Sequence, residues 1–183
     1  VIAAAGLGAG LAAAELADEM GGRLRIVGTP AEEGGGGKVL MLRDGAFDGV
    51  DAAVMVHPAD HDLPTMAAIA IQRLAVTYTG RASHAAAAPW DGRNALDAAV
   101  LGYMNVAALR QHIRSDERIH GIFTEAGEAP NVVPARAAAT WYVRSPSVRG
   151  LHKLKERVLA CLRAGADAAG CTLSTRSRPP SSR

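Results

Sequence analysis

Aromatic residues are scarce in this chain, at 4% of its 183 residues, and it has two cysteines, Cys161 and Cys171. So few cysteines argue against a disulfide-stabilised scaffold and suit a reducing compartment, from which we expect a cytoplasmic protein. The charge is mixed throughout, with a formal net value of +2 and no basic block. Because nucleic-acid binding normally needs a clustered basic patch, we expect no nucleic-acid partner.

Long apolar runs are also missing. The longest one, at the N-terminus, is shorter than the roughly 20 residues that a membrane-spanning helix needs, and it lacks the basic start of a signal peptide. We therefore expect no membrane association. Apolar residues still make up 49% of the chain, which is enough for a core in one domain or two small ones. The chain starts at Val1 within a predicted helix, which we interpret as a sign that it is a fragment.

The first part of the chain has the pattern of a parallel βαβ unit. The sequence predicts a helix at Ala3–Met20, a strand at Arg23–Thr29, a helix at Lys38–Arg43 and a strand at Asp51–Val56. Two strands joined by a helix are usually parallel, and ligands bind beyond the carboxyl ends of such strands. We assign residues 1–66 to part of an α/β domain.

The pattern changes after Pro64. The sequence predicts strands and helices in the order Ala68–Thr79 (strand), Arg93–His112 (helix), Ile119–Thr124 (strand), Ala137–Arg144 (strand), Ser147–Ala169 (helix) and Cys171–Thr175 (strand). The order β-α-β-β-α-β is that of a ferredoxin-like α+β sandwich. We assign residues 67–175 to this second domain and expect residues 176–183 to be a disordered tail.

The loop GTPAEEGGGGK, at Gly28–Lys38, places Glu32 and Glu33 side by side. A phosphate-binding loop is excluded, because Val39 follows Lys38 where such a loop needs a serine or threonine, and two acids would repel phosphate. A hydrolytic metal site needs a ligand, an open position for water and a base, and two adjacent carboxylates can divide those roles. His57, at the end of the next strand, would add a nitrogen ligand. The spacing alone is also explained by a solvated acidic turn and a buried or capping histidine.

Other polar residues also have structural explanations. His61 is expected at the surface, because Pro58 and Pro64 leave little room for a helix that would pair it with His57. A loop histidine such as His84 is usually structural, and Asn131 before Val-Val-Pro is a typical turn residue. Arg144, at the end of the strand-like WYVR, would normally pair locally. The two cysteines are expected to serve packing.

Five motifs occur in a fixed order: GTPAEEGGGGK, VHP, GRASHAAAAPWDGRNALDA, PNVVP and WYVRSP. Together they resemble the zinc aminoacylase and carboxypeptidase metallopeptidases, and most closely the branch of aminobenzoyl-glutamate hydrolases and β-alanyl-lysine dipeptidases. The resemblance extends from about Val1 to Thr175. It implies that residues 1–66 are part of a catalytic domain and that residues 67–175 are a lid and dimerisation domain.

The resemblance also implies roles for residues of the first part. Glu32 corresponds to the general base, and Glu33 and His57 correspond to metal ligands. The cofactor would be Zn²⁺, or another divalent metal such as Mn²⁺ or Co²⁺. The reaction would be hydrolysis of an amide bond in an N-acyl amino acid, a dipeptide or an aminobenzoyl-glutamate-like molecule.

In the second part, His84 matches a lid histidine that this family donates to the active site of the partner in a homodimer. Asn131 and Arg144 match lid residues that hold the carbonyl and the carboxylate of the small-molecule substrate. The family also has a Cys-Gly-His segment and a last metal histidine, which are missing here. We therefore expect a middle fragment that is inactive alone. The alternative is a non-catalytic dimerisation module.

Overall fold

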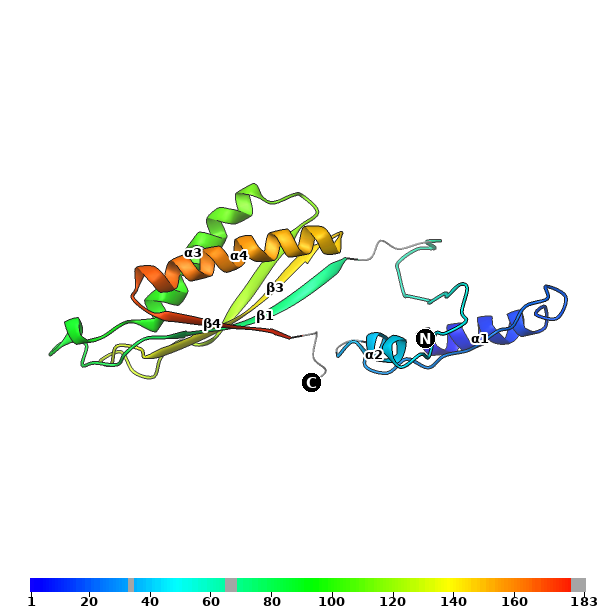
Figure 1. The fold of residues 1–183 in the computed structure, drawn as a ribbon, viewed down its shortest axis with the longest axis horizontal. Coiled ribbons are helices and arrows are strands. Elements are labelled where there is room, and N and C mark those ends of the chain that lie inside the picture. The colour runs from blue at the N-terminus through cyan, green and yellow to red at the C-terminus, as the bar shows by residue number, and fades with distance from the viewer. Residues whose placement is uncertain (33–34, 65–68, 179–183) are drawn as a thin grey trace. The chain divides into compact units, whose positions relative to one another are not determined.

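The computed structural model describes residues 1–32, 35–64 and 69–178. The chain separates into two compact units, Val1–Met66 and Ala67–Pro180. The second unit has a layered α+β fold, whereas the first unit contains short helices joined by extended chain (Figure 1).

The second unit is built on one four-stranded antiparallel sheet. Its elements are β1 (Ala70–Thr79), α3 (Ala95–Leu109), β2 (Arg118–Glu125), β3 (Arg136–Ser145), α4 (Val148–Ala168) and β4 (Thr172–Arg178). The strands lie in the order β2-β3-β1-β4, and every neighbouring pair is antiparallel. Short 3-10 turns, η1 (Pro89–Asp91) and η2 (Arg110–His112), flank α3. The element order β-α-β-β-α-β predicted from the sequence is confirmed.

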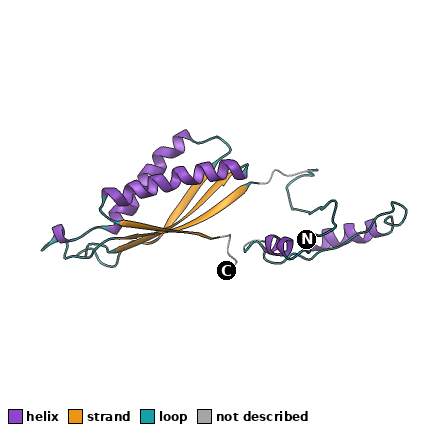
Figure 2. Cartoon of the chain, viewed as in Figure 1, coloured by secondary structure: helices purple, strands orange, loops and turns teal. Residues whose placement is uncertain are grey.

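Both helices cover one face of the sheet, and the other face is left uncovered by them (Figures 1 and 2). Side chains alternate along β3, so that every second residue is buried beneath the helices while its neighbours are half-buried on the other face. The buried set on β3 is Ala137, Ala139, Trp141, Val143 and Ser145. On α4, apolar residues at helical spacing are buried against this face, at Leu151, Leu154, Val158 and Leu162.

Side-chain caps fix where the two helices begin. The Asn94 side chain accepts hydrogen bonds from the backbone N–H groups of Leu96, at 2.9 Å, and Asp97, at 3.1 Å. The Ser147 hydroxyl accepts one from the N–H of Gly150 at 3.1 Å. Such caps satisfy amide groups that have no partner within the first helical turn.

α3 and α4 cross at very close range, and a glycine on each helix permits this. A Cβ atom at Gly165 would overlap the backbone nitrogen of Gly102 and would lie 2.5 Å from the carbonyl oxygen of Ala98. These are backbone atoms of α3, so they cannot move without displacing the helix. Close to this crossing, the Asn105 side chain donates a hydrogen bond of 3.2 Å to the carbonyl oxygen of Cys161.

The first unit contains α1 (Ile2–Ala14) and α2 (Gly37–Arg43), and its described residues form no strand. The predicted strands Arg23–Thr29 and Asp51–Val56 are therefore not formed in this structure, and neither is the parallel βαβ unit. A parallel pair needs cover on both faces, but Gly37 is the only described residue of this unit that is buried. Without a core to face, the two segments remain extended and unpaired.

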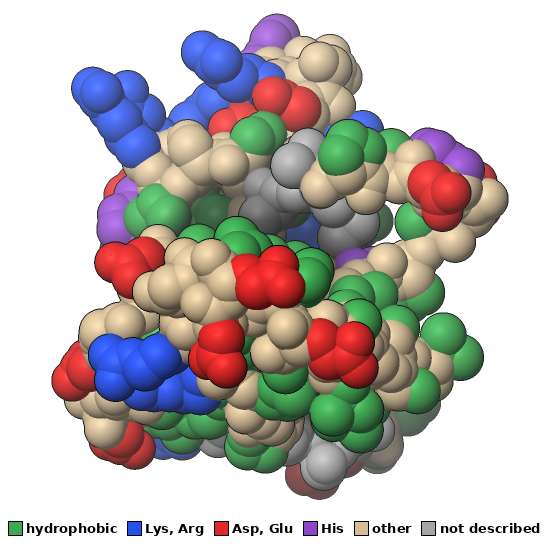
Figure 3. All heavy atoms as spheres, turned by 90° about the vertical axis from the view of Figure 1, so that its right-hand side faces the viewer, with side chains coloured by type: hydrophobic (Ala, Val, Ile, Leu, Met, Phe, Trp, Pro, Cys, Tyr) green, Lys and Arg blue, Asp and Glu red, His purple; other side chains and the backbone are tan. Residues whose placement is uncertain are grey.

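Apolar side chains of the first unit accordingly remain exposed, and Figure 3 shows hydrophobic side chains open to solvent beside acidic and basic ones. Among them are Leu7, Leu11, Leu24, Ile26, Val54 and Met55. α1 is apolar on all sides, which is typical of a helix surrounded by other protein. No helix in the described part of the chain is long and apolar enough to cross a membrane.

Some predicted boundaries also differ from those in the structure. α1 ends at Ala14 rather than at Met20, and turns follow it. β4 continues past its expected end at Thr175, because its residues up to Arg178 pair with β1. Arg176–Arg178 therefore belong to the sheet and not to a disordered tail. The rest of that tail, like the predicted strand start at Ala68, lies outside the described residues.

The helix crossing gives a direct test of the packing. We expect Gly165→Ala to lower the free energy of unfolding by about 1–3 kcal/mol, because the added methyl group meets fixed backbone of α3. Urea unfolding followed by circular dichroism measures this change. The matched control is Ala164→Ser, which adds one atom at an exposed position of the same helix and should change stability by less than about 0.5 kcal/mol. Equal effects of the two variants would contradict the close crossing.

Candidate functional site

The glutamate loop enters α2 through a turn. Ala31 in this turn has a positive φ of 53°, which is uncommon for a residue other than glycine. A carboxylate oxygen of Glu32 lies 3.9 Å from the ammonium nitrogen of Lys38, and both side chains are partly exposed. Glu33, the expected metal ligand, lies outside the described residues. Glu32 therefore lies near the cationic Lys38 and has access to solvent.

His57 has a hydrogen bond that fixes which ring nitrogen carries the proton. Its Nδ1 lies 2.9 Å from the carbonyl oxygen of Pro58. A carbonyl oxygen can only accept, so Nδ1 must be the donor and the neutral ring has a free lone pair on Nε2. An Nδ1–H group held by a backbone carbonyl is a common arrangement in metal-ligating histidines. In this form the Nε2 atom of the neutral ring is available as an acceptor or a ligand.

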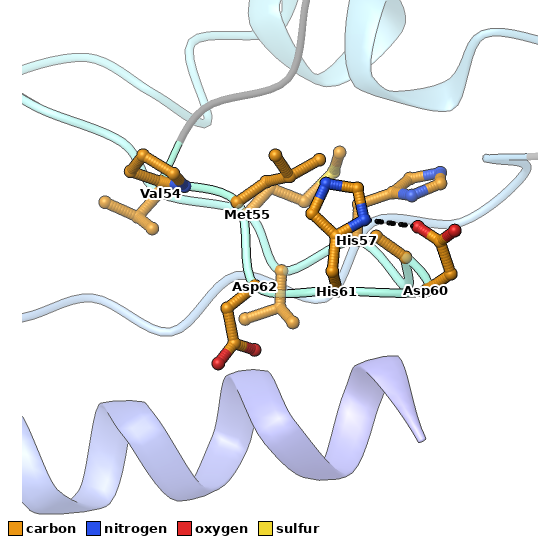
Figure 4. Close-up of a pocket in the computed structure, with 10 residues that line it drawn as sticks. Val54, Met55, His57, Asp60, His61 and Asp62 are labelled. Atoms are coloured by element: carbon orange, nitrogen blue, oxygen red, sulfur yellow. Dashed lines mark hydrogen bonds and ion pairs between the residues drawn. The ribbon is translucent and has the colours of Figure 1, made fainter.

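Residues around His57 form a shallow surface pocket (Figure 4). Nδ1 of His61 lies 2.5 Å from a carboxylate oxygen of Asp60. His61 is exposed, as expected from the sequence, and its partner is its own neighbour in the chain. Within residues 1–32, 35–64 and 69–178, no three His, Cys, Asp or Glu side chains come close enough together to hold a metal ion. The expected pairing of Glu33 with His57 involves a residue outside those ranges and stays a prediction.

In the second unit, two long connectors are joined to each other. We call residues 80–94, between β1 and α3, and residues 126–135, between β2 and β3, the paired loops. Backbone hydrogen bonds link Gly80 N–H to Ala135 O at 2.8 Å, Val133 N–H to Ser83 O at 2.9 Å and Ala85 N–H to Asn131 O at 2.9 Å. His84 and Val132 form an isolated β-bridge between them. The two loops are therefore one structural element.

His84 lies on the paired loops and has the opposite tautomer to His57. Its Nδ1 accepts hydrogen bonds from the backbone N–H groups of Ala86, at 3.3 Å, and Ala87, at 3.1 Å. An accepting Nδ1 cannot carry a proton, so the neutral ring has its N–H at Nε2. The residue is exposed, and its Nε2–H can donate to a ligand. Asn131, also exposed, is held beside it through its backbone carbonyl.

Arg144 lies at the other end of the sheet. It pairs with Ile71 of β1 and Arg118 of β2, whereas the paired loops leave the sheet where Thr79 pairs with Arg136. In Figure 1 these loops extend beyond the end of the strands. From Arg136 to Arg144 the distance along β3 is roughly 26 Å, at about 3.3 Å per residue. One copy of the chain therefore does not bring Arg144 together with His84 and Asn131.

The surroundings of Arg144 are unusual for an arginine. Its Nε atom is buried and has no hydrogen-bond partner among the described residues. It lies on the face of the sheet that the helices do not cover, since Val143 and Ser145 beside it are buried beneath them. A buried guanidinium N–H without a partner costs free energy, which an anionic ligand would recover.

His120 on β2 is a polar residue that no sequence motif singles out. Its ring meets Tyr142 edge-on, with centroids 5.8 Å apart. Burial, and then the positive charges of Arg144 and Arg110, lower the pKa of His120. The ring is therefore neutral at neutral pH and does not add to the charge of Arg144. Only the cross-strand register, which places His120 diagonal to Arg144, brings the two together.

The cysteines have no sign of a chemical role. Cys161 and Cys171 are both free thiols. Burial raises the pKa of each, so both remain protonated at neutral pH, where a thiolate would be needed to attack a substrate or bind a metal. The expectation that they serve packing is consistent with this environment.

Comparison with known proteins identifies this arrangement of sheet, helices and paired loops. The model of the family described as "Peptidase dimerisation domain" matches residues 70–169, which is more than half of the chain. The chain therefore belongs to the peptidase dimerisation domain family. The matched residues include all of α3, β2, β3 and α4.

Relatives of known activity resemble a longer part of the chain. The "Xaa-Arg dipeptidase" of Mus musculus is 43% identical over 152 residues, which cover 83% of this chain and 35% of the relative. One of the p-aminobenzoyl-glutamate hydrolase proteins of Escherichia coli is 39% identical over 140 residues, covering 75% of this chain and 29% of that protein. The crystal structure of the "Aminobenzoyl-glutamate utilization protein" from Klebsiella pneumoniae is 26% identical with a TM-score of 0.56, covering 62% of this chain and 30% of that structure.

The dipeptidase and the hydrolase are hydrolytic enzymes, as the resemblance of the five motifs implied. The chain spans about a third of the length of the first two, at 35% and 29%. The family recognised from the motifs is thus confirmed, and the chain is partial relative to the enzymes that it matches.

The hydrogen bonds assigned to His57 and His84 can be tested through their tautomers, without an assay of enzyme activity. We expect neutral His57 to carry its proton on Nδ1 and neutral His84 to carry it on Nε2, because their partners are a carbonyl oxygen and two amide groups. Long-range ¹H–¹⁵N correlation spectra above pH 8 distinguish the two forms. His152, exposed on α4 and without a ring hydrogen bond among the described residues, serves as the control and should show averaged shifts. The same tautomer at His57 and His84 would contradict the assignment.

Proposed function

We propose that this chain is part of a metal-dependent amidohydrolase that cleaves an N-acyl amino acid, a dipeptide or a similar amide. One observation carries the proposal: His57 offers a lone pair and His84 offers an N–H at the same ring position, Nε2. A lone pair suits a metal ligand, and an N–H suits a donor to the carbonyl oxygen of the substrate. Residues 1–66 would belong to the catalytic domain and residues 67–175 to the lid.

The metal would be held by Glu33 and His57 of this chain and by further ligands from the rest of the enzyme. Catalytic zinc typically has three protein ligands, so these two residues form an incomplete set. When bound, Zn²⁺, or Mn²⁺ or Co²⁺ in its place, lowers the pKa of water and polarises the carbonyl group of the amide. The chemistry of the donors fits such an ion, because the Nε2 of His57 is free to coordinate.

The residues of this chain would then move the protons. Glu32 takes a proton from the attacking water and returns it to the leaving amine, as a general base followed by a general acid. The Nε2–H of His84 donates to the oxygen that becomes negatively charged as water adds to the carbonyl carbon. Such a donor contributes on the order of 3 kcal/mol to the stability of the transition state. The carboxamide of Asn131, on the same paired loops, also contacts the carbonyl group.

Arg144 would bind the carboxylate of the substrate, and this requires a second copy of the chain. The paired loops and Arg144 lie roughly 26 Å apart along β3, at about 3.3 Å per residue, and a dipeptide is much shorter. A two-fold dimer resolves the conflict, because His84 and Asn131 of one copy can meet Arg144 of the other. We therefore propose a homodimer in which the lid of each copy completes the site of its partner.

The surface that pairs in this dimer would be the free edge of β2. The sheet has two edges, β2 and β4. On β2, Ile122 and Phe123 are 69% and 40% exposed, and α3 above it exposes Val100 and Met104, at 44% and 59%. The exposed residues of β4 are polar or charged, such as Ser174 and Arg176. Apolar surface next to an unpaired strand edge is typical of an interface.

Near the start of β2, one backbone group of this edge already has a hydrogen-bond partner within the chain. The guanidinium of Arg110 donates a hydrogen bond of 3.0 Å to the carbonyl oxygen of Ile119 and lies over the ring of Tyr103. Tyr103 in turn packs against Phe123, with ring centroids 5.9 Å apart. The carbonyl oxygen of Ile119 already accepts this hydrogen bond. We therefore expect strand pairing with the second copy to use the part of β2 beyond Ile119, around Gly121 and Phe123.

The first unit also fits a longer enzyme. Its apolar side chains and its helix α1, which is apolar on all sides, need further protein to cover them. The segments 23–29 and 51–56 could pair as parallel strands once such cover is present, and this would bring Glu32, Glu33 and His57 to one edge of a sheet. The full-length protein would act in the cytoplasm, which is consistent with the two free thiols of this chain.

A mixing experiment on the full-length protein tests the shared site. Make Glu32→Gln, which should retain the metal and lose the proton transfer, and His84→Ala, which removes the donor; each should be nearly inactive alone. After subunit exchange, a mixed dimer has one site with neither change, so it should recover about half of the wild-type activity. Hydrolysis is measured on dimers whose composition is verified by mass spectrometry.

Inactive mixed dimers would refute the assignment of His84 to the partner's site. Metal analysis is the control for Glu32→Gln, because loss of the metal would mean that Glu32 and Glu33 have exchanged roles. If the wild-type full-length protein dimerises but hydrolyses no amide, the remaining explanation is a dimerisation module without catalytic activity.

The interface on β2 is tested by one charge at the strand edge. We expect Ile122→Lys to convert the dimer to a monomer, because two copies of the lysine would be buried close together at a two-fold interface. Analytical ultracentrifugation measures the change. Ser174→Lys, at an exposed position of the opposite edge, is the matched control and should remain dimeric. A monomeric Ser174→Lys with a dimeric Ile122→Lys would assign the interface to β4.

A further inference from the structure

A surface pocket of about 670 Å³ lies between the start of α4, η2 and the turn that leads into β2. Ser145 at the end of β3 also lines it, and Ser145 pairs with Ala70 at the start of β1. In Figure 1 the starts of α4 and β1 lie at the same end of the second unit. Ser145 is buried beneath the helices, whereas Arg144 lies on the other face of the sheet. We call this pocket the α4 pocket.

Buried polar side chains form the floor of the α4 pocket. Glu117 and Ser145, which line it, are 7% and 2% exposed. One carboxylate oxygen of Glu117 accepts a hydrogen bond of 3.0 Å from the backbone N–H of Arg114, and the other lies 3.5 Å from the Ser145 hydroxyl. A Cβ atom at Gly150 would overlap that hydroxyl, so only glycine lets α4 begin directly on the floor. The turn, β3 and α4 are thus packed together here.

Four cationic side chains line the same pocket. They are Arg114, from the turn before β2, and Arg149, Lys153 and Arg157, from α4. The three on α4 are four residues apart, so they lie on one side of the helix. Among the described residues, no ion pair involves any of the four. Set against Asp116 and Glu117, they leave the pocket with an excess of positive charge.

The charges at the start of α4 are the reverse of those that stabilise a helix. The N–H groups at a helix start carry partial positive charge, so acidic residues are favoured there. The first turn of α4 has no acidic residue, and Arg149 lies in it instead. Like charges four residues apart on a helix also repel each other. Departures from local preference are expected at functional sites, and an anionic ligand would offset both unfavourable interactions.

Arg157 is already held in place at the wall of the pocket. Both terminal nitrogens of its guanidinium donate to the carbonyl oxygen of His112, at 3.2 Å each. A guanidinium has five N–H groups, so others remain for a ligand. Because these hydrogen bonds already order the side chain, less conformational freedom is lost when a ligand binds.

We propose that the α4 pocket binds a phosphate monoester. A phosphate dianion has the charge and the acceptor oxygens that clustered arginine and lysine side chains bind. The pocket is larger than a phosphate ion, its volume is in the range of small-molecule sites, and Ile113 and Leu154 supply apolar surface for the esterified group. The inference goes beyond the proposed amide hydrolysis and does not depend on it, because neither His84 nor Arg144 lines this pocket.

Isothermal titration calorimetry on the full-length protein tests the site, with inorganic phosphate and phenyl phosphate as probes at constant ionic strength. We expect both probes to bind, and phenyl phosphate to bind at least as tightly as inorganic phosphate. Lys153→Gln and Arg149→Gln should each weaken binding about 3- to 10-fold, because one positive charge next to the phosphate group is lost. Lys153→Arg, which retains the charge, should bind like the wild type.

Arg163→Gln is the matched control, because it removes one positive charge from another exposed position of α4. Arg163 lies about 15 Å beyond Lys153 along the helix, at 1.5 Å per residue. This distance exceeds the screening length of roughly 8 Å at physiological ionic strength, so binding should change less than about 2-fold. Thermal unfolding followed by circular dichroism, without ligand, verifies that each variant is folded.

Four results would overturn the inference about the α4 pocket. If neither probe binds at millimolar concentrations, there is no site. If Lys153→Gln and Arg163→Gln weaken binding equally, the attraction is diffuse. If neither Lys153→Gln nor Arg149→Gln weakens it, the phosphate binds elsewhere in the protein. If inorganic phosphate binds more tightly than phenyl phosphate, the pocket takes the free ion and not an ester.

Discussion

The second unit depends on the close contact of α3 and α4 above the sheet. Gly102 and Gly165 let the two helix backbones approach each other, and this lets both helices lie on one face of four strands. Their apolar side chains then cover the alternating buried residues of β3, including Trp141. Strand pairing in turn fixes where the connectors leave the sheet. The positions of His84 and Asn131 thus follow from a core that contains neither of them.

The sequence was sufficient to predict the second unit because its local signals agree with its packing. The apolar stripe Leu151–Leu162 has helical spacing, and Ser147 marks the helix start where the structure has it. The strands of the first unit had equally good local patterns at 23–29 and 51–56, but a strand also needs partners and a core. Strand partners and a core depend on contacts that the local sequence pattern does not encode. Among the described residues, the two segments do not pair. The end of β4 was misjudged for a similar reason, since polar Arg176–Arg178 are strand residues only because β1 pairs with them.

For the candidate site, the motifs give a set of candidate residues, which stay predictions, but they do not give the geometry. Nothing in the spacing of Asn131 and Arg144 indicates that β3 separates them by most of its length. Similarly, the letters HP and SHAAA do not reveal that one histidine donates through Nδ1 and the other accepts there. These facts come from backbone carbonyl and amide groups, which every residue has. They support the proposed separation of tasks between two copies of the chain.

The candidate site in the second unit depends on the paired loops being a structured support that holds His84 and Asn131 in fixed positions. Native-state hydrogen exchange followed by NMR measures this at the amides of Ala85 and Val133, which donate across the two loops. We expect these amides to be protected together with those of β1 and β3, because breaking their bonds requires opening of the loops. Exchange of Ala85 and Val133 at the rate of an unstructured chain, while the sheet stays protected, would contradict a structured support.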